Sequence, residues 1–508
     1  MDIFLILLSA ILNGLSRLPF HCGWMGFISV IPLLCYFERG KKKGKILLRD
    51  AFIYNAAGLT IWLHWIWGVT AWGFIGIIVF YTIYYYLAFL AVQLIWQKLP
   101  RFKYIGFIVI MLSVQYLQNF TEFRFPWLDL GYSLTDYTVL LQAADIGGIA
   151  FLSLLLLVCN VLLYNILRGK YKNLIPLGLI LILWVGYGLW CFKSVKLTKT
   201  DEHITIMQPS IPQNEKWETE HFDELFKRYN ELTAQAAQDS TKLLIWPEAA
   251  MPTYLLRDHT RREMVQELCN IYHLDIFTGF PDVLPAPENY PGEAYYYNAA
   301  TLFKPFQKYD EPYYKIILVP VGERIPYLNY FPFLWKLQFG QANWEYGPAC
   351  RYFNSGNLTF SSLICFEIAF PELIHKMAFR NEGENKGGPP DKIDFLVNIT
   401  NDAWFGRSVG PWMHGMMTKF RAVENRIQIY RCANTGISMA VDPMGRVLTQ
   451  TKLFEIKNIK APLYRADKVP LYYYLYRWPR LIILLALVLI VCALLNDKIL
   501  FPSGKRLK

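Results

Sequence analysis

The sequence carries little charge for its length. Charged residues make up 18% of its 508 residues, and hydrophobic residues make up 54%, whereas a soluble protein averages about 25% charged residues. The deficit is uneven, because only 21 of the first 192 residues are charged, against 63 in residues 193–470. This distribution excludes a single water-soluble globule and a disordered chain. It predicts a membrane-embedded part joined to a globular part.

Metal-binding motifs are also lacking. The nine cysteines form no C-x-x-C pair, and no H-E-x-x-H segment occurs, so we expect no metal site and no diffusible cofactor. Four cysteines, Cys269, Cys350, Cys365 and Cys432, fall in the globular part, and the sequence does not determine whether any of them pair.

Eight hydrophobic runs have the length of a transmembrane helix. They lie at residues 2–18, 21–37, 52–68, 73–96, 104–120, 146–167, 174–192 and 479–495. Lys and Arg are concentrated after the second, fourth and sixth runs and in the C-terminal tail, which places these loops and both termini in the cytoplasm. The same residues account for the net charge of +11, so we do not expect nucleic-acid binding.

Four parts follow from this pattern. They are a seven-helix transmembrane domain (1–192), an extracytoplasmic domain (203–465), an eighth transmembrane helix (472–496) and a basic cytoplasmic tail (497–508).

In the extracytoplasmic domain, short β-type runs alternate with charged helical segments, which is typical of a layered α/β domain. The expected strands are 203–207, 242–246, 275–279, 298–303, 358–365, 394–399 and 437–441. The expected helices are 218–238, 261–272, 371–380 and 411–425, and the Gly- and Pro-rich segment 381–391 is expected to be a surface loop.

Three places in this domain carry reactive side chains. Glu248 follows the apolar run Leu243–Trp246, where burial would raise its pKa toward that of a general base. Lys315 and Glu323 lie eight residues apart in a stretch without helical periodicity. Cys365 ends a β-type run, and such a turn exposes a nucleophile and offers the next backbone N–H to an oxyanion. Each feature alone has an ordinary structural explanation.

Taken together, Glu248, Lys315 and Cys365 in this order resemble the nitrilase (carbon–nitrogen hydrolase) superfamily. With seven predicted spans before the domain and one after it, the chain resembles one branch, the apolipoprotein N-acyltransferase family of bacterial inner-membrane enzymes. Three further segments resemble that family: Phe125–Leu128, Gln208–Trp217 and Asn398–Gly406. The sequence departs from its pattern at Phe366, where the family commonly has Tyr, and at Val321, where it often has an aromatic residue.

The resemblance implies a polytopic α-helical membrane protein of eight transmembrane helices with a nitrilase-like αββα sandwich on the periplasmic side. It implies that the sn-1 acyl chain of a phospholipid passes through a Cys365 thioester to the N-terminal amine of S-diacylglyceryl-cysteine, the last step of lipoprotein maturation. The expected partners are therefore the phospholipid donor, the diacylglyceryl apolipoprotein acceptor and the bilayer, and the expected state is a monomer.

Roles for individual residues follow from their chemistry within this reaction. Glu248 is the base for the Cys365 nucleophile, and Lys315 stabilises the oxyanion together with the Phe366 N–H. Glu323 orients Lys315 or assists proton transfer, and Glu367 supports the site. The expected substrate-binding residues are Trp127, Trp217, Asn298, Tyr327 and Trp335.

The segment 325–347 is rich in aromatic residues and poor in charge. It is either part of the core or, as we expect this close to Lys315 and Glu323, a lid that dips into the lipid interface. Two other functions remain open at this point. One is a membrane-tethered amidase that uses water as acceptor, and the other is a catalytically inactive lipoprotein-binding or transport protein.

Overall fold

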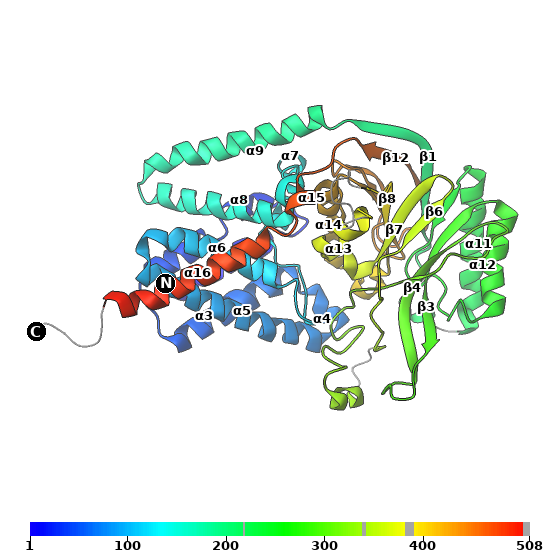
Figure 1. The fold of residues 1–508 in the computed structure, drawn as a ribbon, viewed down its shortest axis with the longest axis horizontal. Coiled ribbons are helices and arrows are strands. Elements are labelled where there is room, and N and C mark those ends of the chain that lie inside the picture. The colour runs from blue at the N-terminus through cyan, green and yellow to red at the C-terminus, as the bar shows by residue number, and fades with distance from the viewer. Residues whose placement is uncertain (217–218, 338–341, 381–390, 501–508) are drawn as a thin grey trace, which may run out of the picture. The chain divides into compact units, whose positions relative to one another are not determined.

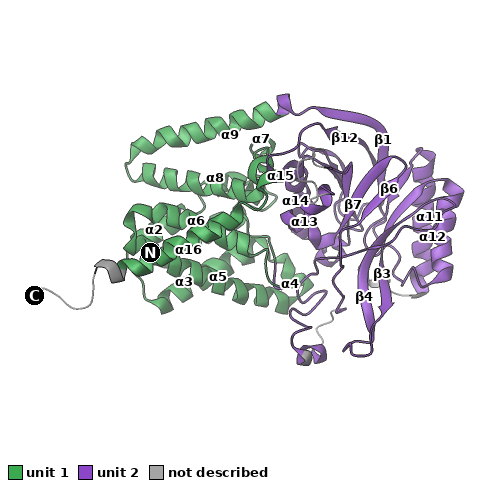
Figure 2. Cartoon of the chain, viewed as in Figure 1, with its two compact units in different colours: residues 1–121, 125–191, 474–508 green, residues 122–124, 192–473 purple. Residues whose placement is uncertain are grey.

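The computed structural model describes residues 1–216, 219–337, 342–380 and 391–500 (Figure 1). The chain forms two compact units (Figure 2). The first, which we call the helical unit, contains residues 1–121, 125–191 and 474–508. The second, the sandwich unit, contains residues 122–124 and 192–473.

The helical unit is built from apolar helices. Its described α-helices are α1 (Asp2–Leu15), α2 (Ile31–Glu38), α3 (Gly44–Trp62), α4 (Trp65–Val69), α5 (Ala71–Lys98), α6 (Lys103–Leu117), α7 (Thr138–Leu141), α8 (Ala144–Leu167), α9 (Leu174–Ser194, which runs into the sandwich unit) and α16 (Pro479–Leu500). Short 3₁₀-helices are η1 (Gly23–Phe27), η2 (Pro100–Phe102), η3 (Leu130–Leu134) and η4 (Tyr171–Asn173).

Four described segments are long and apolar enough to cross a membrane: Ala71–Lys98, Ala144–Leu167, Tyr171–Ser194 and Pro479–Asn496. They coincide with predicted spans four, six, seven and eight. The remaining predicted spans fall on helices that are shorter, interrupted or more polar. Helices α1 and α6 have 14 and 15 residues, span two is divided between η1 and α2, and α3 includes charged residues in its first two turns. A hydropathy run does not reveal where the backbone leaves the helix, so the count of eight spans stays a prediction.

Large apolar side chains are exposed along these helices. Trp72 of α5 is 79% exposed, Ile175 of α9 is 78% exposed and Leu481 of α16 is 66% exposed. Helices that expose so much apolar surface are stable only in apolar surroundings. Lipid can provide these surroundings, because the backbone N–H and C=O groups of a helix bond to one another and need no water. The helical unit is therefore the membrane part of the protein.

The sandwich unit contains two six-stranded sheets (Figure 1). The first has the order β12-β1-β2-β3-β4-β5, and the second has the order β11-β10-β9-β8-β7-β6. Strands β1, β2 and β3 are parallel neighbours, as are β7, β8 and β9. The strands are β1 (Leu197–Gln208), β2 (Leu243–Ile245), β3 (Asp275–Pro285), β4 (Ala294–Phe303), β5 (Tyr313–Tyr314), β6 (Tyr352–Ser355), β7 (Leu358–Ile364), β8 (Phe395–Thr400), β9 (Gln428–Ala433), β10 (Met439–Val441), β11 (Val447–Gln450) and β12 (Lys457–Ala466).

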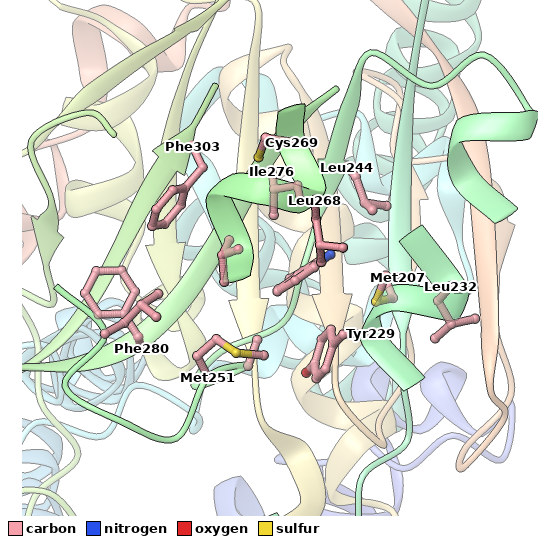
Figure 3. Packing of buried hydrophobic residues seen from close by; sticks show 14 of the residues in the cluster. Met207, Tyr229, Leu232, Leu244, Met251, Leu268, Cys269, Ile276, Phe280 and Phe303 are labelled. Carbon is pink, nitrogen blue, oxygen red and sulfur yellow. The ribbon is translucent and has the colours of Figure 1, made fainter. Parts of the chain in front are cut away.

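Helices cover the sheets of the sandwich unit. The α-helices are α10 (Gln213–Lys216), α11 (Phe222–Gln238), α12 (His259–Tyr272), α13 (Pro371–Ala378), α14 (Gly410–Asn425) and α15 (Tyr472–Leu475), and the 3₁₀-helices are η5 (Thr219–His221), η6 (Pro332–Lys336), η7 (Cys365–Ala369) and η8 (Asp402–Phe405). Tyr229 and Leu232 of α11 pack with Leu268 of α12 and with Leu244 and Ile276 of the first sheet (Figure 3). Helices α13 and α14 contact the second sheet.

Aromatic rings join the two sheets. Phe277 of β3 lies 5.3 Å from Phe360 of β7 and 5.1 Å from Phe353 of β6, measured between ring centroids. Phe360 also stacks on Phe395 of β8 at 5.0 Å. With α11 and α12 on one side and α13 and α14 on the other, the layers follow the order αββα that the family resemblance implies.

The seven predicted strands and four predicted helices all occur, with bounds that differ by a few residues. Strands β5, β6, β9, β11 and β12 were not predicted. Strand β9 shows why, because its polar residues Gln428 and Arg431 are fully buried, so its sequence lacks the alternation that marks a half-buried strand. The predicted surface loop 381–391 lies outside the described residues except for Asp391.

Phe360→Ala tests the packing between the sheets. The substitution removes a buried ring that contacts both sheets, so we expect a loss of about 3–5 kcal/mol in the free energy of unfolding. Thermal unfolding of the detergent-purified protein measures it. Phe306→Ala, at a side chain that is 72% exposed, serves as the control, and equal losses in both variants would contradict the assignment.

Candidate active site

The reactive side chains lie where strands end. Glu248 lies three residues beyond the end of β2, and Lys315 directly follows β5, both in the first sheet. Cys365 directly follows β7 of the second sheet and opens η7. Strands β2 and β7 each belong to a parallel pair in their own sheet, and each is followed by one of these residues. Glu248 and Cys365 are 117 positions apart in the sequence, yet they are close enough for Glu248 to raise the pKa of Cys365.

Lys315 lies between two carboxylates. Its Nζ donates to Glu323 Oε1 at 2.8 Å and lies 4.0 Å from Glu248 Oε1. The Lys315 side chain is fully buried, and that of Glu248 is nearly so. A buried ammonium requires such partners, because it cannot be solvated by water.

Two asparagines hold the carboxylates. Asn298 Nδ2 donates to Glu248 Oε1 at 2.6 Å and more weakly to Glu323 Oε1 at 3.4 Å. The backbone N–H of Asn401 donates to the other Glu248 oxygen, Oε2, at 2.7 Å. The Asn298 carbonyl also accepts from the Lys315 N–H at 2.9 Å. The structure places Asn298 between the two carboxylates, and its expected contact with substrate stays a prediction.

Burial and neighbouring charges shift the ionisation of these groups. Burial raises the pKa of Glu248, and Lys315 opposes the rise. Burial alone would lower the pKa of Lys315, but the neighbouring acidic groups, Glu323 foremost, outweigh it and raise this pKa, so the ammonium stays protonated. Burial also raises the pKa of Cys365, and Glu248 adds to the increase. Cys365 is therefore a thiol at rest, and a base would be needed to turn it into a nucleophile.

Cys365 adopts a left-handed backbone conformation, with φ of 51°. Few non-glycine residues adopt this conformation, and it is frequent at functional turns. It forms a sharp connection between β7 and η7, and the next residue is the buried Phe366, whose ring contacts Phe370.

Glu367 connects the nucleophile turn to the segment that carries Lys315. Its Oε2 accepts from the Ile364 N–H at 2.7 Å. Its Oε1 accepts from the Ile316 and Ile317 N–H groups at 2.7 and 3.0 Å, and the Tyr313 hydroxyl reaches both oxygens. Burial raises the pKa of Glu367 to about 7, although these donors oppose the rise. Glu367 thus acts through its neighbours as a positioning residue.

Three of the other expected substrate-binding residues have described contacts of their own, and their role in substrate binding stays a prediction. Tyr327 donates its N–H to Glu122 Oε2 at 2.6 Å, and Trp335 packs edge-on against Tyr290. Trp127 belongs to the helical unit, where it stacks on Phe125. Trp217 lies outside the described residues.

Several buried polar residues near the site were not identified from the sequence. Lys216 Nζ donates to the Glu248 main-chain carbonyl at 3.0 Å. Asp402, His414 and Arg431 form a buried network behind Cys365. The segment Asn398–Gly406 was noted for its resemblance, but no spacing rule connects Asp402 with partners 12 and 29 residues away.

Two family matches together cover most of the chain. Residues 203–467 match the carbon–nitrogen hydrolase family, and residues 9–162 match the N-terminal domain of apolipoprotein N-acyltransferase. The first match alone spans more than half of the chain.

Two relatives that are similar to this chain over nearly their whole length are both named apolipoprotein N-acyltransferase. The apolipoprotein N-acyltransferase of Geobacter metallireducens is 30% identical over 89% of this chain and 88% of its own. That of Chlorobaculum tepidum is 29% identical over 92% of both chains. Among solved structures, an amidase from Nesterenkonia sp. matches at 17% identity and a TM-score of 0.37, over 53% of this chain and 92% of its own. Saccharomyces cerevisiae Nit3, of the nitrilase superfamily, matches at 17% identity and a TM-score of 0.38, over 55% and 93%.

Lys216→Met tests the electrostatics of Glu248. The charged groups that act on Glu248 are Lys315 and Lys216, which lower its pKa, and Glu323, which raises it. Burial lowers the pKa of Lys216 to about 8, so Lys216 is charged at acidic pH. Its removal raises the pKa of Glu248 further, and Glu248 must be ionised to act as a base.

The acid limb of the pH–rate profile for Cys365 acylation should therefore move to higher pH, by about half a unit to one unit. The rate of acylation measured between pH 4.5 and 8.5 gives this shift. Lys242→Met, at an exposed lysine at the start of β2, is the matched control. An unmoved limb, or a shift to lower pH, would contradict the role of Lys216.

Proposed function

This chain belongs to the apolipoprotein N-acyltransferase family, and on that premise we propose that it is an acyltransferase that works through Cys365. The acyl donor is a membrane phospholipid, which gives up its sn-1 chain. The acceptor is the α-amine of S-diacylglyceryl-cysteine at the N-terminus of an apolipoprotein. The observation that carries the assignment of residues is the buried Lys315 between Glu323 and Glu248, with Cys365 close enough to contribute to the raised pKa of Lys315.

The first half-reaction loads the enzyme. Glu248 accepts the Cys365 proton as the sulfur attacks the ester carbonyl of the phospholipid. Lys315 and the Phe366 N–H stabilise the resulting oxyanion. Collapse of the tetrahedral intermediate breaks the ester bond, and Glu248 returns the proton to the departing alcohol. The products are a thioester on Cys365 and a lysophospholipid.

The second half-reaction transfers the acyl chain. The neutral amine of the acceptor attacks the thioester carbonyl, and the same oxyanion donors stabilise the intermediate. Glu248 accepts a proton from the nitrogen, the C–S bond breaks, and the proton passes to the Cys365 sulfur. An amide and free enzyme result. Thiolate leaves readily, so the amine needs no further activation, and exclusion of water favours transfer over hydrolysis.

The arrangement in the membrane follows from charge and hydropathy. We propose eight spans, with residues 1–192 as seven helices and 472–496 as the eighth, in the bacterial inner membrane. The catalytic domain, residues 203–465, lies in the periplasm, and both termini, including the basic tail 497–508, are cytoplasmic. The four segments that qualify as spans, and the exposed apolar side chains of α5, α9 and α16, support this topology. A monomer suffices, because one chain contributes every group of the reaction.

The decisive test supplies purified protein with labelled phospholipid and a diacylated lipopeptide. We expect an acyl adduct on Cys365 and then a triacylated peptide, by mass spectrometry. Cys365→Ala should lower product formation by at least about 1,000-fold, because the nucleophile is lost. Cys350→Ala, at another partly buried cysteine of the sandwich unit, should retain activity.

Two results would reject the proposal. Free acid or ammonia without triacylated peptide would identify a hydrolase that uses water. Full function of Cys365→Ala in cells that depend on this gene would identify a protein that binds or transports lipoproteins without catalysis.

We further propose that the aromatic segment 325–347 contacts lipid. Tyr330, Phe331 and Phe333 are 72%, 50% and 63% exposed, so these three side chains are not part of the core. This supports the lid rather than the core alternative, and it places large apolar groups within ten residues of Glu323. The segment also includes residues 338–341, among them Phe339, which lie outside the described residues.

Tyr330→Ser combined with Phe333→Ser tests this surface. We expect turnover on bilayer phospholipid to fall about tenfold more than turnover on a short, soluble acyl thioester, because only the former requires contact with lipid. Kinetics in proteoliposomes and in solution give the ratio of variant to original turnover on each of the two substrates. Phe306→Ser, equally exposed but between β4 and β5, is the control. Equal losses on both substrates would reject the lid.

A further inference from the structure

The main-chain carbonyl of Cys365 is held by two side chains from other elements. His414 Nε2, on α14, lies 3.2 Å from this oxygen, and Asn398 Nδ2, on β8, lies 3.3 Å from it. A carbonyl has two lone pairs, and the two side chains can use both. The nucleophile's own peptide group is thus oriented by residues 33 and 49 positions later in the sequence.

This carbonyl belongs to the same peptide unit as the Phe366 N–H. The peptide unit is planar, and in a trans peptide the C=O and N–H bonds point in opposite directions; the described residues contain no cis peptide bond. A group that fixes the Cys365 carbonyl therefore also fixes the direction of the Phe366 N–H. Left-handed backbone at Cys365, with φ of 51°, is costly for a residue with a side chain and needs such support.

The proton on His414 can be assigned from its partners. A carbonyl oxygen only accepts hydrogen bonds, so Nε2 must carry a hydrogen. Nδ1 lies 3.0 Å from both Arg431 Nη2 and Asp402 Oδ1. Burial lowers the pKa of His414, and Arg431 adds to this, although Asp402 opposes it. In the neutral ring, Nδ1 accepts from Arg431 while Nε2–H donates to Cys365.

Arg431 makes this arrangement rigid. Its guanidinium donates to Asp402 Oδ2 at 2.7 Å and to Asn398 Oδ1, so it contacts both side chains that flank the Cys365 carbonyl through a single planar group. Asn398, Asp402, His414 and Arg431 are all at most 1% exposed. A buried network joined by several hydrogen bonds in this way has few alternative arrangements.

We propose that His414 and Asn398, held by Arg431 and Asp402, are positioning residues that aim the Phe366 N–H at the oxyanion of acyl transfer. In this role they act through the Cys365 carbonyl. They act by orienting one peptide unit, so their loss should affect steps that develop an oxyanion and spare steps that do not. The proposal rests on the function proposed above, in which Cys365 is acylated.

Two reactions of the Cys365 sulfur distinguish a step that develops an oxyanion from a step that does not. Acylation of Cys365 by phospholipid forms an oxyanion, whereas alkylation by iodoacetamide displaces iodide without one. Both rates are measured on the full-length protein by mass spectrometry of the Cys365 peptide, since other cysteines also react. In His414→Leu we expect acylation to fall about 10- to 100-fold, a part of what an oxyanion donor provides, and alkylation to stay within about threefold.

Conservative variants complete the test. His414→Gln keeps a donor near the Nε2 position and should recover acylation to within about tenfold of the original protein, whereas His414→Asn is too short and should not. If His414→Leu does not fold, the difference in acylation between His414→Gln and His414→Asn decides whether His414 has the positioning role. Phe420→Leu, a buried change on the same helix, should leave the ratio of the two rates unchanged.

The outcomes distinguish the two proposals. If acylation and alkylation fall together, or if neither falls, the positioning role is wrong while the proposed function stands. If the original protein forms no acyl adduct on Cys365, the proposed function itself fails.

Discussion

One buried positive charge organises this site. Lys315 is fully buried, with Glu323 at 2.8 Å and Glu248 at 4.0 Å, so an ammonium that could not exist alone in the interior is compensated by two carboxylates. The compensation also works in reverse, because Lys315 limits the rise in the Glu248 pKa that burial causes. A cation that is fixed in place before the substrate arrives can stabilise an oxyanion without reorganisation. The base and the oxyanion donor therefore depend on the same ion pair.

Hydrogen bonds from both sheets hold these charged side chains in fixed positions. Asn298 from the first sheet and the Asn401 N–H beyond the second sheet hold the two oxygens of Glu248. Glu367 joins the nucleophile turn to the backbone after Lys315. Apart from the local bond between Ile364 and Glu367, each of these contacts crosses between segments that are distant in the sequence. The reaction thus relies on the packing of two sheets, to which the Phe277 and Phe360 rings contribute.

The membrane part and the chemistry are connected by the nature of the substrates. Both the acyl donor and the acceptor carry long apolar chains, and a thioester survives until the amine arrives only if water is kept away. The apolar surfaces of α5, α9 and α16 keep the chain in the bilayer, where these substrates are. The exposed aromatic side chains between Tyr330 and Phe333 offer apolar contact close in sequence to the Lys315–Glu323 pair.

The sequence by itself determined the composition boundary between membrane and globular parts and the strand-and-helix pattern of the globular domain, and it predicted Glu248, Lys315 and Cys365 as candidate reactive groups. These are local properties, since hydropathy and strand ends are read within a few residues. It did not reveal the buried strand β9, the breaks in the apolar helices, or the roles of Lys216, Asn401, Asp402, His414 and Arg431. Only the tertiary structure decided these, because a buried polar side chain is recognised by its hydrogen-bond partners, and here those partners come from other strands and helices.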